Sequence, residues 1–181
     1  MVKFLTTLIL AIIIFVPACM FASKMFQFGA QANDNYLELA DEIKTLAKGI
    51  DGQQTQFLLI LDERSMVVLF AKNESLIITH DLEFRSRERY FQTNVYTLKY
   101  PQIQCANEPC LCLCKDYEMR EQIVCKTLQC QILKDIKFID SWYSLRETVE
   151  GPRRTTIELK KQNDLINITG GQKLVDIKHE N

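Results

Sequence analysis

Six of the seven cysteines of this 181-residue chain lie between positions 105 and 130, and three of them alternate in the segment CLCLC, residues 110–114. Thiols packed this closely can form disulfides, bind a soft metal ion, or exchange disulfides with another molecule. The spacing of the cysteines helps to choose among these chemistries. We call Cys110, Cys112 and Cys114 the alternating trio.

The alternation of the trio with Leu111 and Leu113 predicts an extended strand that carries the three thiols on one face. Neighbouring members would lie about 6.6 Å apart with parallel side chains, and the outer two about 13 Å apart, so none should pair within the trio. Each member then needs a partner among Cys105, Cys125 and Cys130. This requirement reduces the 15 connectivities of six cysteines to six.

Local reach of the chain favours one of these six connectivities. A hairpin through KDYEMREQ would bring Cys125 back toward Cys114. The short stretch ANEP leaves Cys105 within local reach of Cys110. The favoured set joins Cys105 to Cys110, Cys112 to Cys130 and Cys114 to Cys125.

A thiol-based site that binds metal or exchanges disulfides through CLCLC is the alternative hypothesis. Structural zinc sites usually use Cys-x2-4-Cys turns, whereas an extended Cys-x-Cys is expected to splay its thiolates along the strand. The pairs 105/110 and 125/130 have four residues between them, at the edge of the zinc range, but no histidine lies nearby. The redox signature Cys-x-x-Cys is also absent, so disulfides are favoured, and no metal or cofactor is assigned.

The N-terminal segment is uncharged from Phe4 to Ala22 and mostly apolar. It is long enough for a transmembrane anchor, while a cleaved secretory signal and a lipid anchor on Cys19 are the other interpretations. All three place the rest of the chain outside the cytoplasm, membrane-anchored or, if the signal is cleaved, secreted. We therefore expect a membrane segment over 1–23, a connector over 24–33 and an extracytoplasmic domain over 34–181.

The charge balance does not favour a nucleic-acid partner, because 22 basic and 23 acidic residues give a net charge of −1. Arg85, Arg87 and Arg89 alternate and are candidates for anion binding if they share one face of a strand. Glu83 and Glu88 dilute that positive field. Membrane contact through residues 4–22 and a protein partner in the cell envelope are the expected interactions.

Few residues suggest catalysis. His80 and Asp81 are neighbours, which on a strand point to opposite faces, and the sequence contains no nucleophile elbow, phosphate loop or dinucleotide fingerprint. No catalytic residue is assigned, although a hydrolase site assembled from scattered residues is left open. Asn73 and Asn167 match the N-glycosylation pattern of exported proteins.

The remaining elements indicate an α+β fold, with one amphipathic helix ahead of a mainly antiparallel β domain stapled by disulfides. The helix is expected to begin at Asp34 or Asn35 and to end at Gly49. Apolar runs at 57–61 and 66–70 predict a hairpin, extended to a meander by the run at 75–80.

The later strands are expected at FRSRERYF, TNVYTLKY, QILKDIKFI, RTTIELKK and LINITGG. The last two of these segments are separated by Gln162-Asn-Asp164, which is a hairpin turn signal.

The apolar N-terminal segment, the stretch FLLILDERSMVVLFAKN, and CANEPCLCLC followed by two more cysteines resemble uncharacterised membrane-anchored proteins of archaea. This resemblance implies an exported domain and supplies no activity, partner or catalytic residue. The sequence thus predicts a membrane-anchored, extracytoplasmic, disulfide-stabilised structural or interaction domain.

Overall fold

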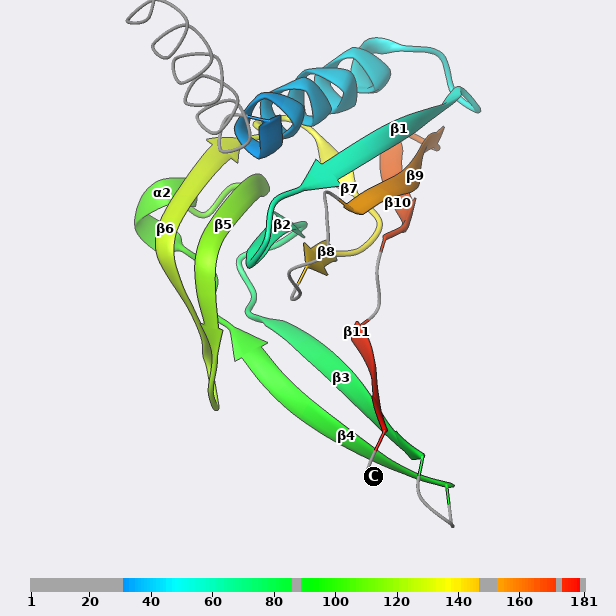
Figure 1. Ribbon diagram of the computed structural model, residues 1–181. Coiled ribbons are helices and arrows are strands. Elements are labelled where there is room, and N and C mark those ends of the chain that lie inside the picture. Colours follow the sequence, from blue (N-terminus) through cyan, green and yellow to red (C-terminus); the bar gives the residue numbers. More distant parts are fainter. Residues whose placement is uncertain (1–30, 86–88, 147–152, 172–173, 180–181) are drawn as a thin grey trace, which may run out of the picture.

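The computed structural model describes residues 31–85, 89–146, 153–171 and 174–179. Over these ranges the chain forms two helices and three mainly antiparallel β-sheets, which confirms the predicted class of fold (Figure 1). The expected membrane segment and Cys19 lie outside the described residues. Within the described ranges, no helix is both long enough and apolar enough to cross a bilayer.

We call the three sheets the outer sheet, the middle sheet and the ribbon sheet. The outer sheet has the order β1 (Gln54–Leu61), β9 (Arg153–Gln162), β10 (Leu165–Gly170) and β7 (Lys137–Phe138). The middle sheet has the order β6 (Ile123–Ile132), β5 (Cys110–Met119), β2 (Ser65–Phe70) and β8 (Trp142–Arg146). The ribbon sheet has the order β11 (Leu174–His179), β3 (Leu76–Arg85) and β4 (Arg89–Leu98). Neighbouring strands are antiparallel except for β10 with β7 and β11 with β3, which are parallel.

The middle sheet separates two hydrophobic cores. On one side, Val67 and Leu69 of β2 pack with apolar residues of the outer sheet and of the N-terminal helix. On the other side, Met66, Val68 and Phe70 pack with the cysteines and with the base of β3 and β4. Every residue of β2 is therefore buried, because successive side chains of a strand point to opposite faces.

The N-terminal helix covers residues 31–48 of the described chain and packs on the first core. Leu39, Ile43 and Leu46 are fully buried, as the apolar stripe predicted. The helix ends before Gly49, as expected. Lys161 of β9 stabilises this end, because its ammonium group donates to the carbonyl oxygens of Ala47 at 2.8 Å and Gly49 at 2.9 Å.

The predicted start of the helix at Asp34 or Asn35 is wrong, because the chain is already helical at residue 31. The buried Asn35 binds the outer sheet instead. Its Nδ2 donates to the carbonyl of Leu58 at 3.1 Å, and its Oδ1 accepts the amide N–H of Ile60 at 2.7 Å. Since β1 is an edge strand, this side chain satisfies backbone groups that no neighbouring strand reaches.

The next residue, Tyr36, binds the middle sheet. Its hydroxyl lies 2.9 Å from the carbonyl oxygen of Leu111 on β5 and 3.3 Å from that of Gln129 on β6. Burial raises the pKa of the Tyr36 phenol well above its usual value, so the hydroxyl keeps its proton and donates. Two consecutive helical residues therefore join the helix to two different sheets.

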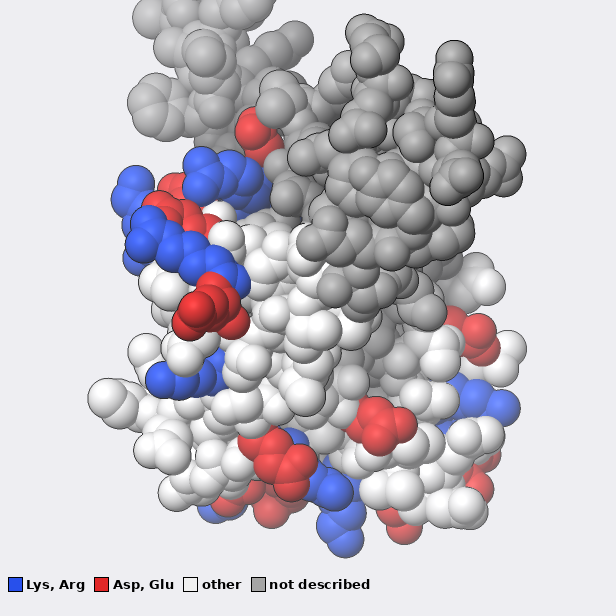
Figure 2. Space-filling view, turned by 90° about the horizontal axis from the view of Figure 1, so that it is seen from below, with Lys and Arg blue, Asp and Glu red and all other residues white. Residues whose placement is uncertain are grey.

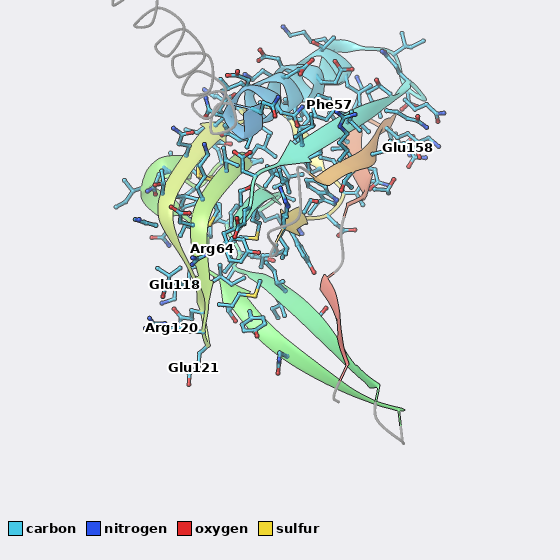
Figure 3. The ribbon with its side chains drawn as sticks, viewed as in Figure 1. Phe57, Arg64, Glu118, Arg120, Glu121 and Glu158 are labelled. Atoms are coloured by element: carbon cyan, nitrogen blue, oxygen red, sulfur yellow. A yellow bond between two sulfur atoms is a disulfide. The ribbon has the colours of Figure 1, made fainter. Side chains whose placement is uncertain are left out.

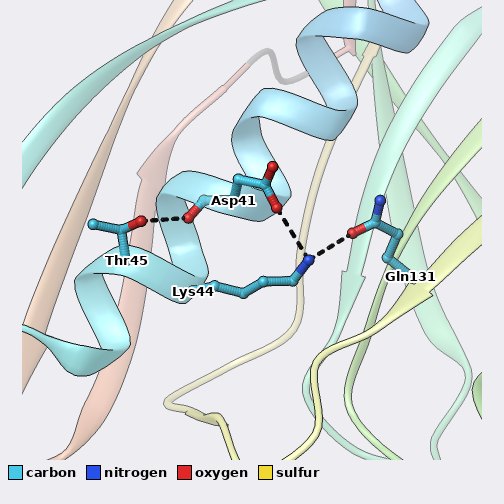
Figure 4. A network of polar contacts seen from close by, with 4 residues as sticks. All are labelled: Asp41, Lys44, Thr45 and Gln131. Atoms are coloured by element: carbon cyan, nitrogen blue, oxygen red, sulfur yellow. Dashed lines mark hydrogen bonds and ion pairs between the residues drawn. The ribbon is translucent and has the colours of Figure 1, made fainter.

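A more exposed contact also joins the helix to β6. Lys44 Nζ lies 3.1 Å from a carboxylate oxygen of Asp41 and 3.1 Å from the side-chain oxygen of Gln131 (Figure 4). Thr45 Oγ donates to the Asp41 carbonyl one turn earlier. Solvent screens such surface pairs, so they contribute little stability compared with the buried contacts.

The predicted hairpin between the runs at 57–61 and 66–70 is wrong, and so is the meander. β1 pairs with β9, whereas β2 pairs with β5 and β8. Between them, Arg64 adopts a left-handed φ of 51° and the Ser65 amide donates to the Asp62 carbonyl at 3.2 Å. This tight turn carries the chain from the outer sheet to the middle sheet. There β2 is buried on both of its faces, as a strand that is apolar on both faces requires.

The strands after residue 75 also differ from prediction. The segment FRSRERYF is not one strand: Arg85 ends β3 and Arg89 begins β4, with residues 86–88 outside the described ranges. TNVYTLKY continues the same strand β4. The segment QILKDIKFI likewise divides between the end of β6 and the short β7. The final hairpin is confirmed: β9 and β10 are joined by Asn163 and Asp164, both with positive φ, as a tight two-residue turn requires.

Replacing Asn35 tests whether its amide secures the edge of β1. Asn35→Ala leaves two backbone groups of the edge strand unpaired, so the free energy of unfolding should fall by about 2 kcal/mol. The amide hydrogen of Ile60 should also exchange faster with solvent. Denaturant unfolding and hydrogen exchange measure these effects, with Asp34→Ala, at an exposed neighbouring position, as the control. Equal stabilities of the two variants would contradict this role of Asn35.

Candidate functional site: the sulfur cluster of α2, β5 and β6

Three disulfides link the six clustered cysteines. The bridges join Cys105 to Cys110, Cys112 to Cys130 and Cys114 to Cys125, with Cα–Cα distances of 5.7, 4.1 and 5.4 Å. These are the three pairs of the favoured set. The trio is completely buried in the second core, while Leu111 and Leu113 point into the first core, as the alternation predicted.

The first bridge depends on a short helix and the turn that follows it. α2 (Gln102–Cys105) ends where Ala106 and Asn107 adopt left-handed φ values of 51° and 65°. The Glu108 amide donates to the Cys105 carbonyl at 2.9 Å, which closes the turn. The chain therefore reverses direction within a few residues and returns at Cys110, so that the buried sulfur of Cys105 reaches the start of β5.

The third bridge depends on a change of face within β5. Cys114 is opposite Leu128 in the ladder, and Cys125 is opposite Tyr117. Between these pairs Asp116 has a left-handed φ of 50°. By strict alternation Tyr117 would share the face of Leu113, yet Tyr117 and Cys125 belong to the second core, with Cys114. The left-handed conformation of Asp116 thus lets Cys125 reach Cys114. No residue pattern in the sequence predicted this change of face.

Two of the three disulfides lie in contact. Cys112 Sγ is 3.8 Å from Cys105 Sγ and 3.8 Å from Cys110 Sγ. The sulfur atoms of Cys105, Cys110, Cys112 and Cys130 all lie within 4.8 Å of one another. We call these four residues the sulfur cluster. The prediction that an extended Cys-x-Cys keeps its two sulfurs apart is wrong for Cys110 and Cys112. Their disulfide partners, Cys105 and Cys130, lie on the same side of β5.

Apolar and aromatic groups surround the sulfur cluster. Phe70 and Tyr100 pack edge to face in the same core, with ring centroids 5.5 Å apart. The Tyr100 hydroxyl donates to the Glu108 carbonyl at 2.7 Å, which ties the strand end before α2 to the turn after it. Burial, with a smaller effect of the Glu108 charge, raises the pKa of the Tyr100 phenol. Cys130 is half-buried and is the most accessible member of the cluster.

Two hollows open on the surface of the described residues near these elements. One, of about 560 Å³, is lined by Tyr100, three residues of α2 and neighbouring polar side chains. The other, of about 440 Å³, lies beside the β5–β6 hairpin and is lined by Arg64, Asp116, Glu118, Val124 and Lys126. Figure 3 labels Arg64 and Glu118 among these residues. The charged groups of this hollow are of both signs.

Charges of both signs also intermingle on the face shown in Figure 2, where Lys and Arg lie beside Asp and Glu among uncharged side chains. Arg85 and Arg89 lie on two strands and are opposite each other in the β3–β4 ladder, where cross-strand partners share a face of the sheet. Arg87 lies outside the described residues. The expectation that one strand carries these arginines is wrong for Arg85 and Arg89, and anion binding by them stays a prediction.

The two glycosylation candidates have different surroundings. Asn73 lies in the exposed turn before β3, where its side-chain amide contacts that of Asn107 at 2.7 Å. Asn167 lies inside β10, half-buried and paired with Lys160 of β9. Asn73 is therefore the better placed of the two for modification, since glycans attach to surface loops.

Comparisons with known proteins give no relative from which to transfer a function. No protein-family model, no curated protein and no solved structure matches the chain. The sulfur cluster and the surfaces described above are therefore the basis for the functional argument.

The disulfides should contribute stability in the order of the chain lengths that they close. Replacing Cys105 and Cys110 by serine opens a loop with a separation of 5 residues and should cost about 2 kcal/mol of unfolding free energy. Replacing Cys112 and Cys130 opens one with a separation of 18 and should cost about 3 kcal/mol. Denaturant unfolding of the oxidised proteins measures both, and the reverse order would contradict a stabilisation governed by loop closure.

Proposed function

We propose that the chain is a membrane-anchored structural or interaction domain that works outside the cytoplasm. The observation that carries this proposal is the set of three disulfides, which uses all six clustered cysteines. Disulfides persist in oxidising compartments and are rare in the reducing cytosol. The apolar run from Phe4 to Ala22 supplies a means of export and of attachment to the membrane.

The ribbon formed by β3 and β4 supports a role in binding a protein partner. With β11 beside β3, it extends away from the outer and middle sheets (Figure 1). Near its base, Ile78 is buried in the second core, whereas Ile77 and Val95 are 65% and 59% exposed. The register pairs Ile77 with Thr97 and Val95 with Thr79, so these four side chains share one face. An exposed face that combines β-branched apolar and hydroxyl side chains suits contact with another protein of the cell envelope.

Thiol accessibility and intact mass test the proposed location. We expect the full chain, extracted from membranes and denatured, to be six hydrogens lighter than the reduced chain. A thiol reagent should not alkylate residues 105–130 before reduction. A membrane-impermeant amine reagent should label the domain in intact cells, and a cytosolic protein in the same cells serves as the control. Six free thiols under oxidising conditions, or protection of the domain from the impermeant reagent, would contradict the proposal.

Site-specific photocrosslinking in cells tests the proposed role of the ribbon. A photoreactive phenylalanine analogue at Val95 should give a discrete crosslinked product, because the proposed partner covers this face. Ile77→Lys in the same chain should reduce that product several-fold by placing a charge in the contact. The control position is Glu118, which is exposed at the far end of β5. Crosslinks that are equal at the two positions and insensitive to Ile77→Lys would argue against a specific contact here.

A further inference from the structure

The geometry of the sulfur cluster points to a second use of the same four cysteines. We propose that, when its two disulfides are reduced, the cluster becomes a tetrathiolate site for one Zn²⁺ ion. The inference goes beyond the proposed role as an extracytoplasmic domain, because it assigns a metal-binding state to the chain before oxidation closes the bridges.

The distances between sulfur atoms carry the argument. Zinc–sulfur bonds of about 2.3 Å in a tetrahedron place the four sulfurs about 3.8 Å apart. Two contacts that are not disulfide bonds, from Cys112 Sγ to Cys105 Sγ and to Cys110 Sγ, are each 3.8 Å. The largest separation among the four sulfurs is no more than 4.8 Å. Reduction needs to open only the two bonded pairs to reach the geometry of a zinc site.

The fold positions the four ligands from three separate elements. Cys105 ends α2, Cys110 and Cys112 lie on β5, and Cys130 lies directly opposite Cys112 on β6. Backbone hydrogen bonds hold the ladder between β5 and β6 and the left-handed turn after α2, in addition to the disulfides. The ligands therefore stay near one another when the bridges open.

The surroundings favour a soft cation bound by thiolates. Three of the ligands are fully buried among apolar side chains, where a free thiol keeps its proton and a bound cation replaces it. Cys130 is half-buried and provides the route of entry. Four thiolates suit the tetrahedral preference of Zn²⁺.

The chemistry of loading and release balances with simple reagents. Two molecules of a trialkylphosphine and two of water reduce the two disulfides to four thiols and leave two phosphine oxides. Binding of Zn²⁺ then releases four protons. In the reverse direction, two molecules of hydrogen peroxide and four protons convert the four thiolates into two disulfides and four waters, and Zn²⁺ is released.

Cobalt titration of the reduced full chain in detergent tests the proposal. We expect one equivalent of Co²⁺ to give sulfur-to-cobalt charge transfer and the visible absorption of a tetrahedral site, and Zn²⁺ to displace it. Cys112→Ser should weaken Co²⁺ binding about tenfold or more. The double variant Cys114→Ser/Cys125→Ser is the matched control, because it removes two cysteines of the same strand pair and should leave binding unchanged.

A second measurement does not depend on variants that fold. The wild-type chain made in a reducing cytoplasm with added zinc should contain one Zn²⁺ per molecule, and peroxide should release that zinc as four thiols disappear. Absence of both the cobalt spectrum and the stoichiometric zinc would overturn the proposal. Metal binding that survives Cys112→Ser, or that is lost in the folded control variant, would overturn the assignment of ligands. Neither result would alter the expected disulfides of the exported chain, so this proposal and the proposed location fail separately.

Discussion

The fold depends on burial of β5 on both of its faces. Leu111 and Leu113 fill the core between the middle and outer sheets, and the alternating trio fills the core on the opposite side. The strand can do this because its period of two sends each residue type to one core. The sulfur atoms contribute apolar packing like small hydrophobic groups, and they also link the strand covalently to α2 and β6. The second core thus combines hydrophobic burial with restriction of the unfolded chain.

Polar side chains close the first core at its margins. Lys161 reaches from β9 to the last turn of the helix, and Arg146 of β8 donates to the Leu61 carbonyl at 2.9 Å at the end of β1. Partial burial raises the pKa of the neighbouring Asp62 carboxyl, and the charges of Lys115 and Arg146 counter part of that rise. Lys161 and Arg146 donate to backbone carbonyls and Asp62 lies near opposite charges, which offsets the cost of burying these groups, although the buried Nε of Arg146 has no hydrogen-bond partner among the described residues.

Local patterns in the sequence predicted elements well and their partners poorly. The helical stripe, the Asn163–Asp164 turn and the common face of the trio are properties of short stretches, and each is found in the structure. β2 could pair with any of several apolar strands, and in the structure it pairs with β5 and β8. The turn from Asp62 to Ser65 ahead of β2 carries no residue that predicts these partners. Apolar runs such as MVVLF are attractive to any neighbour, so tertiary packing decides the sheet order.

The candidate site shows the same division. The connectivity of the disulfides could be narrowed because strand geometry forbids pairing within the trio. The contact between two of the bridges could not be predicted, because it depends on backbone conformations at Ala106 and Asn107 that return α2 to the strand. Likewise, the left-handed conformation of Asp116 changes which face of β5 the following side chains occupy. The sequence could not predict this change, because aspartate adopts many other conformations.

The adjacent residues Asn35 and Tyr36 also determine how the domain would respond to mechanical load. One binds the edge of the outer sheet and the other binds two strands of the middle sheet, both near the beginning of the described helix. A pulling force applied through the chain ahead of residue 31 would meet these hydrogen bonds before it reached the rest of the helix. The tension would divide between two sheets, one of which is cross-linked by disulfides.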